Sequence, residues 1–221
     1  MKKVISFSLW GDNPKYCVGA VKNAELAKDI YPDWICRYHV GSTTPSSYVE
    51  QLEKHENVEV ILRGEHCDWT ASFWRFEDAS DLDVSVMISR DTDSRLNLRE
   101  KKAVDVWLKS GKKFHIMRDH PFHGIEIMAG MWGVRGNFLG DMKHLIKDYY
   151  KGDFWQVDQN FLKDVIYPIV CNNACVHDEF FENKPFPSPR IDNQFVGQVY
   201  DEKEETVIEH VQALNNYLKN I

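Results

Sequence analysis

Long apolar runs and basic blocks are missing from this chain of 221 residues, and we expect no secretory leader. No stretch approaches the roughly 20 apolar residues that a transmembrane helix needs, so the sequence predicts no integral membrane segment. The formal net charge is -7 at pH 7 and lysines and arginines are not clustered. This charge argues against nucleic acid or a membrane surface as the partner, although local basic residues could still serve a phosphorylated small molecule.

Cysteine is scarce, and the five residues present show no paired metal-binding spacing. Cys171 and Cys175 form a lone pair with no second pair, so we expect no zinc site. An odd number of cysteines and the lack of a signal peptide predict a reducing compartment, and we therefore expect a cytoplasmic protein.

The rest of the composition is that of an ordinary soluble protein, with 43% hydrophobic and 28% charged residues. Short β-branched strands alternate with amphipathic helices through the first half of the chain, an order that predicts a mostly parallel sheet with helices on both faces. We expect strands at 3–11, 34–40, 58–62, 84–89, 114–117 and 169–176, and helices at 14–30, 44–52, 73–76, 97–108, 138–150, 157–168 and 207–218. The fold class is α/β, and residues 1–221 form a single domain.

The stretch that organises this pattern is the buried strand Val84 to Ser89 and the two carboxylates after it, Asp91 and Asp93. Side chains at positions i and i+2 of an extended segment point the same way. Both aspartates can therefore face one point outside the strand end, where open α/β sheets hold ligands. Carboxylates suit a hard cation such as Mg²⁺ or Mn²⁺, and the alternative is a solvated acidic turn.

Five motifs in order resemble the GT-A class of nucleotide-sugar glycosyltransferases, and within it a viral and bacterial polysaccharide-type group. They are the run from Arg90 to Arg95 (R-D-x-D-S-R), Arg99-Glu100, the block from His115 to Pro121, Gly130 to Gly133, and Asp158-Gln159. The resemblance implies a GT-A fold, with residues 1–95 binding the nucleotide and residues 96–221 binding the sugar and acceptor. It implies a metal-dependent enzyme that moves a sugar from a nucleoside-diphosphate sugar to a glycan or other hydroxyl acceptor. A UDP-sugar is expected because uridine donors dominate this class.

The same resemblance supplies roles for individual residues. Asp91 and Asp93 would hold Mn²⁺ or Mg²⁺, with Asp93 as the direct ligand and Asp91 also reaching the donor. Arg75 would contact the diphosphate, where a guanidinium suits bidentate binding, or else cover apolar surface. The nucleoside would meet the end of the first strand, at Ser8, Trp10 and Gly11.

Asp158 is the expected catalytic carboxylate, with a helix N-cap as the alternative. It would be the base that deprotonates the acceptor in an inverting enzyme, or a group that positions the donor in a retaining one. The pairing with Gln159 favours retention and leaves inversion open. Asp119 is the second catalytic candidate, as a hydrogen-bond partner of sugar hydroxyls.

The C-terminal part contributes three further expectations. His177 would complete the metal site, although a surface histidine is an equal alternative. Lys184 and Arg190, at the two ends of a proline-rich loop, would contact the donor. His120 and His123 raise the alternative of a separate metal site, which is disfavoured because no strong third ligand lies near them in the sequence.

Two other functions compete with the glycosyltransferase. A nucleotidyltransferase or sugar-phosphate pyrophosphorylase on a similar fold usually needs a basic, glycine-rich loop after the first strand, and Gly11 to Pro14 is short and carries no basic residue. A non-catalytic carbohydrate-binding module would not need the aspartate pair.

Overall fold

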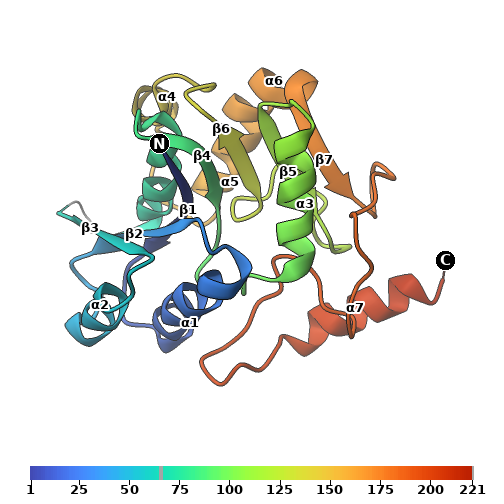
Figure 1. Ribbon diagram of the computed structural model, residues 1–221, viewed down its shortest axis with the longest axis horizontal. Coiled ribbons are helices and arrows are strands. Elements are labelled where there is room, and N and C mark those ends of the chain that lie inside the picture. The colour runs from blue at the N-terminus through green and yellow to red at the C-terminus, as the bar shows by residue number, and fades with distance from the viewer. Residues whose placement is uncertain (65–66, 221) are drawn as a thin grey trace.

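Seven strands pair into one sheet in the order β3-β2-β1-β4-β6-β5-β7, within residues 1–64 and 67–220, which this computed structural model describes (Figure 1). β6 runs antiparallel to both of its neighbours, and every other pairing is parallel. The expected single α/β domain with a mostly parallel sheet is therefore confirmed. The strands are β1 (Lys2–Leu9), β2 (Ile35–Gly41), β3 (Val58–Arg63), β4 (Val84–Ser89), β5 (Phe114–Arg118), β6 (Trp132–Arg135) and β7 (Ala174–Asp178).

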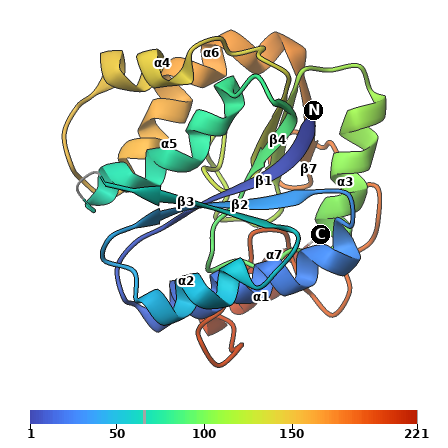
Figure 2. The ribbon, with the colours of Figure 1, turned by 60° about the vertical axis from the view of Figure 1, so that its left-hand side comes forward.

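Helices cover both faces of this sheet, and a separate apolar cluster lies between the sheet and the helices on each face (Figure 2). One face carries α1 (Pro14–Ile30), α2 (Ser46–Glu53) and α3 (Leu98–Lys109). The other face carries η1 (Trp69–Ser80), α4 (Met142–Tyr149), α5 (Val157–Phe161), η2 (Leu162–Ile166) and α6 (Tyr167–Val170), which is followed by η3 (Cys171–Asn173). The C-terminal helix is α7 (Ile208–Leu218). None of the helices within the described ranges combines the length and apolar character that crossing a bilayer requires.

Helix starts follow the local signals in the sequence. Asn13 caps α1 by accepting a hydrogen bond from the Lys15 amide at 3.0 Å, and Pro14 opens the helix, where its missing N–H costs nothing. Asn97 caps α3 in the same way, accepting from the Glu100 amide at 2.9 Å. Both caps lie at the start of helices that the sequence predicts, at 14–30 and 97–108.

The segment after Asp158 differs from its prediction. Pro168 does not end a helix; it lies in the first turn of α6, where its missing amide is tolerated, and the π-helical turn η2 precedes it. Helical turns consequently continue through Asn173, and the predicted strand at 169–176 is shortened to β7. Residues 69–80 form a 3₁₀ helix, η1, that is longer than the helix expected around Phe73.

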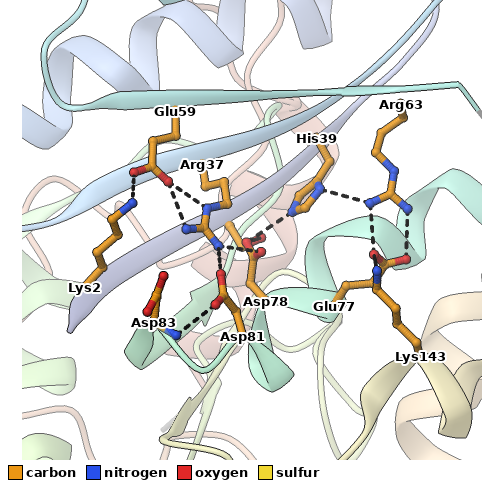
Figure 3. A network of polar contacts seen from close by, with 11 residues as sticks. Lys2, Arg37, His39, Glu59, Arg63, Glu77, Asp78, Asp81, Asp83 and Lys143 are labelled. Atoms are coloured by element: carbon orange, nitrogen blue, oxygen red, sulfur yellow. Dashed lines mark hydrogen bonds and ion pairs between the residues drawn. The ribbon is translucent and has the colours of Figure 1, made fainter.

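A buried polar network joins the sheet to η1 on the face that this helix covers (Figure 3). Asp78 lies at its centre. Its Oδ2 accepts a hydrogen bond from Ser6 Oγ at 2.6 Å and lies 3.1 Å from His39 Nε2, and its Oδ1 accepts from Arg37 Nη1 at 2.9 Å. Arg37 also contacts Glu59 and Asp81. Polar side chains of β1 and β2 therefore contact η1 through ion pairs and hydrogen bonds. The residues that alternate with them along each strand are apolar and pack against α1.

Because Asp78 is buried, we expect Asp78→Ala to cost about 3 kcal/mol of unfolding free energy, the low end of the range for breaking a buried pair. Arg37 keeps its other two acidic partners, which limits the loss. Asp81→Ala is the matched control: it removes a partly exposed partner of the same arginine and should cost less than about 1 kcal/mol. Urea unfolding of the two variants measures both values, and equal losses would contradict the central place of Asp78.

Candidate functional site

The cavity that holds the acidic pair opens where β1 and β4, two adjacent parallel strands, end. It has a volume of about 410 Å³. The residues that line it come from both halves of the chain: Ser8, Leu9, Trp10, Gly11, Asp12, Asn13, Tyr16, Trp69, Ser72, Arg75, Asp91, Thr92, Asp93, Ala129, Trp155, Gln156, Asp158, Gln159 and Val199. A larger cavity of about 630 Å³ adjoins the Asp78 network, but it lies away from these strand ends and its buried charges already pair with one another. We therefore take the smaller cavity as the candidate site.

The loop that carries Asp91 and Asp93 is held by its own flanking residues. Arg90 is fully buried and bonds Glu100 at 3.0 Å and the Ser89 carbonyl at 2.7 Å. Ser94 Oγ donates to the Asp91 carbonyl at 2.9 Å, which closes the turn. Two residues of the R-D-x-D-S-R motif therefore shape the loop and leave its carboxylates to face the cavity.

Distant parts of the chain brace the same loop from outside. Asn23 of α1 donates to the carbonyls of Thr92 and Ser94. Arg95 bonds Glu204 with two nitrogens, at 2.8 and 3.2 Å, and the Tyr200 amide donates to the Asp93 carbonyl at 2.8 Å. The segment between β7 and α7 thus supports a loop from the first half of the chain.

Gly130 allows the backbone before β6 to lie directly against Asp91. A Cβ at this position would sit 2.0 Å from Asp91 Oδ2 and 2.5 Å from Asp91 Cγ. Such a contact is too short to exist, so any side chain at this position would displace the Asp91 carboxylate. The Gly-Met-Trp-Gly stretch of the sequence is therefore connected to the acidic pair by close packing.

Three of the acidic side chains that line the cavity are paired with cations of the chain itself. The buried Arg75 guanidinium bridges two of them: Nη1 contacts Asp91 Oδ1, and Nη2 donates to Asp158 Oδ2 at 2.9 Å. Lys15 Nζ lies 2.7 Å from Asp93 Oδ2. Three carboxylates therefore share two cations around one cavity.

Burial and mutual repulsion act on these carboxylates. Burial raises the pKa of Asp93, the nearby Asp91 raises it further, and Lys15 opposes both without cancelling them. Burial also raises the pKa of Asp158, where Arg75 acts in the opposite direction. Burial and the neighbouring carboxylate of Asp91 therefore disfavour the charged forms of Asp93 and Asp158, and an additional cation would favour them.

The donor set fits a hard divalent cation that also binds a ligand. Within residues 1–64 and 67–220, no three His, Cys, Asp or Glu side chains are placed to hold a metal together. Asp91 and Asp93 nevertheless offer oxygens, and Mg²⁺ is commonly held by one or two carboxylates with water and substrate phosphates completing its shell. The two aspartates therefore suit a cation that is bound jointly with a phosphorylated ligand.

The three residues predicted to meet the nucleoside lie together at the end of β1. The Arg75 amide donates to Ser8 Oγ at 3.1 Å, so Ser8 ties the end of β1 to the part of η1 that carries Arg75. Gly11 adopts a positive φ of 76° and its amide donates to Thr43 Oγ1 at 2.8 Å. Trp10 packs edge-on against Trp69, with ring centroids 6.5 Å apart. These residues form one wall of the cavity.

Asp119 and Arg190 are joined to each other and do not line the cavity. Asp119 is fully buried, and its oxygens accept from Arg99 at 2.9 and 3.0 Å, from Arg190 at 2.6 Å and from the Val196 amide at 2.8 Å. Arg190 also contacts Glu179 at 3.0 Å. This arrangement fastens the segment after β7 to β5 and α3.

His177 and Lys184 also lie outside the cavity. His177 is buried on β7, three strand spacings of about 4.8 Å from β4, and its Nδ1 lies 2.8 Å from His115 Nε2. Lys184 is half exposed and pairs with Glu182 at 2.5 Å. Of the eleven residues predicted from the sequence, the structure brings together Ser8, Trp10, Gly11, Arg75, Asp91, Asp93 and Asp158, and not Asp119, His177, Lys184 and Arg190.

Several residues of the site carried no predicted role. Lys15 gives no motif signal, because it is one basic residue in the first turn of a helix. Trp155 is 66% exposed beside the cavity, and an isolated aromatic in a loop is equally uninformative. Gln159 accepts a hydrogen bond from the Ala129 amide at 2.9 Å and donates one to the Ile127 carbonyl, so it ties α5 to the segment before β6 that contains Gly130. For this residue the sequence did offer a signal, the Asp158-Gln159 motif.

No protein-family model matches the chain, and no curated protein matches it in sequence. Solved structures do match its fold. One is a glycosyltransferase involved in the glycosylation of the major capsid of PBCV-1, with 14% identity, 80% of this chain and 82% of that chain covered, and a TM-score of 0.54. Another is S. aureus TarS 1–349 in complex with UDP, with 12% identity, coverage of 84% and 59%, and a TM-score of 0.52.

A third match is 4-diphosphocytidyl-2C-methyl-D-erythritolsynthase from Anaerococcus prevotii, with 10% identity, coverage of 99% and 96%, and a TM-score of 0.50. The chain spans less than two thirds of the TarS structure. At these identities the similarity is one of fold. It confirms the expected GT-A type α/β architecture, which the capsid glycosyltransferase shares with this synthase.

Proposed function

We propose that this protein is a glycosyltransferase that moves a sugar from a nucleoside-diphosphate sugar to a hydroxyl acceptor. The observation that carries the proposal is the cluster of Asp91, Asp93 and Asp158 around Arg75 in one cavity at the ends of β1 and β4. This is the edge at which open α/β sheets bind nucleotides. The ordered motifs further support membership of the viral and bacterial polysaccharide-type group.

The donor would lie across the two halves of the chain. Residues 1–95 supply the wall made by Ser8, Trp10 and Gly11 for the nucleoside, and Arg75 for the diphosphate, where its fork suits two phosphate oxygens. Residues 96–221 supply Asp158 and its neighbours for the sugar and the acceptor. A UDP-sugar is the preferred donor, and a glycan is the preferred acceptor.

A divalent cation, Mn²⁺ or Mg²⁺, fits this proposal, with Asp91 and Asp93 as its protein ligands. When bound, it would neutralise the charge that develops on the departing diphosphate. Arg75 contributes positive charge at the same place without any metal. Because its guanidinium is buried and held by Asp158, it is already oriented before the donor arrives.

Asp158 is the group that faces the reacting sugar in this proposal. Its raised pKa makes it a better proton acceptor than an ordinary aspartate, which suits a base that removes the acceptor's hydroxyl proton. The ion pair with Arg75 instead suits a carboxylate that stays charged and stabilises positive charge on the sugar. The Asp158-Gln159 pair favours the second role and hence retention.

A nucleotidyltransferase is the second candidate, and Lys15 is the observation that favours it. The loop after β1 carries no basic residue, but Lys15 follows it directly and lies at the acidic pair. Such a cation could serve a triphosphate. Release of pyrophosphate from a nucleoside triphosphate in the presence of a sugar phosphate would identify this activity.

Calorimetry with UDP- and GDP-sugars tests the proposal. We expect one of these donors to bind in the presence of Mn²⁺ or Mg²⁺, and binding to disappear with EDTA. Asp93→Ala should abolish it while the circular dichroism spectrum stays unchanged. The control Asp105→Ala removes an exposed carboxylate of α3 that pairs with Lys101, and should bind as the wild type does. Sugar binding that ignores both metal and Asp93→Ala would favour a carbohydrate-binding module instead.

A further inference from the structure

Lys15 occupies an unusual place for a basic residue. It is the second residue of α1, where the partial positive charge of the helix N-terminus disfavours a cation. Its ammonium nonetheless points to the acidic loop and lies 2.7 Å from Asp93 Oδ2. Burial lowers the pKa of Lys15, but Asp93, together with Tyr16 and Asp91, raises it by more and the net shift is upward. The negative charge around the ammonium therefore more than offsets the cost of burying it.

The pair also occupies the carboxylate that a metal would need. Asp93 is 14% exposed and has a cavity-facing position, whereas the Lys15 side chain is 29% exposed and can withdraw into solvent. The other aspartate, Asp91, is held by Arg75, which is buried and fixed by Asp158. Of the two cations in the site, Lys15 is thus the one that is free to move.

We propose that Lys15 is the resident counter-ion of Asp93, which holds this carboxylate in place while no divalent cation is bound and competes with that cation for it. After displacement, the lysine stays tethered beside the cavity and turns to the diphosphate of the donor. Only the contact between Lys15 and the diphosphate rests on the proposed function; the competition at Asp93 does not. Lys15 is a positioning and binding residue in this account, and it takes no part in proton transfer.

The inference gives opposite expectations for two ligands. Removing the charge of Lys15 takes away a competitor and a repulsive positive charge, so the metal alone should bind more tightly. The same change removes an attractive charge from the diphosphate, so a nucleoside diphosphate should bind less tightly. A lysine that merely stabilised the loop would not produce opposite signs, because loosening Asp93 would weaken both ligands.

The first measurement uses Mn²⁺ without nucleotide, with free Mn²⁺ counted by electron paramagnetic resonance. We expect Lys15→Met and Lys15→Gln to lower the Kd for Mn²⁺ on the order of tenfold, because a unit charge next to a divalent ion is removed. Lys15→Arg keeps the charge and should stay near the wild-type value. Lys22→Met is the matched control, since it neutralises an exposed lysine on the same helix, one that forms an ion pair with Glu25 and lies away from the acidic loop.

The second measurement titrates UDP and GDP by calorimetry at saturating Mn²⁺. For whichever nucleotide binds, Lys15→Met should raise its Kd on the order of tenfold, and Lys15→Arg should restore most of the loss. The inference is overturned if neither neutral variant binds Mn²⁺ more tightly than the wild type, or if Lys22→Met gives the same gain. Failure of both nucleotides to bind the wild type would refute the proposed function, whereas the Mn²⁺ result would still decide the competition at Asp93.

Discussion

Replacing Arg75 with methionine is expected to lower kcat/KM about 10³-fold, the upper range for losing one preorganised group that stabilises transition-state charge. Two effects combine in this loss. The diphosphate loses a buried guanidinium, and Asp91 and Asp158 lose the cation that bridges them. Steady-state rates at saturating metal, with the donor identified by calorimetry, measure the loss.

A pH–rate profile separates this role from a structural one. Arg75 now holds down the pKa of Asp158, against the upward effect of burial. In Arg75→Met this carboxyl should protonate at a higher pH, so the acid limb of the profile should move upward. Arg75→Lys retains a charge without the fork and should fall between the two. Arg135→Met removes a positive charge from β6 instead and should leave the pH–rate profile unchanged. If the acid limb of Arg75→Met did not move, the contact between Arg75 and Asp158 would be contradicted.

The strand ends could be predicted because their signals are local. The run from Val84 to Ser89 is short, β-branched and apolar, and whatever follows it must emerge at the edge of the sheet. Asp91, Asp93 and the end of β1 therefore came together as expected. Asp158 was identified through the resemblance, in which an acidic residue followed by glutamine at a helix start is one of the motifs.

Asp119 shows why the same logic fails elsewhere. It also follows a strand, β5, but β6 runs between β5 and β4 and is antiparallel to both. The order of strands depends on pairings between distant segments, and no local pattern in the sequence encodes it. The carboxylate of Asp119 then meets two arginines that come from 20 and 71 positions away. Lys15 was missed for the same reason, because its partner Asp93 lies 78 positions further along the chain.

Gly130→Ala should lower kcat/KM at least about 10²-fold while leaving the fold intact, since a displacement of about 1 Å at a reacting site is sufficient for such a loss. The added methyl would meet Asp91 Oδ2 at 2.0 Å and Asp91 N at 3.1 Å. A side-chain carboxylate yields more easily than backbone, so Asp91 should turn away from the cavity and leave Arg75. The melting temperature should change little, because the loop remains held by Arg90 and Ser94.

A double-mutant cycle tests whether this loss passes through Asp91. If it does, Gly130→Ala combined with Asp91→Ala should be no slower than Asp91→Ala alone, because the displaced carboxylate is already absent. Additive losses would instead mean that the methyl disturbs another part of the site. Gly124→Ala is the control in the same connection between β5 and β6: its Cβ would come no nearer than 3.4 Å, to the Phe181 ring, and activity should be retained. The cycle therefore links a glycine in the second half of the chain to a carboxylate in the first by a contact that only the folded structure contains.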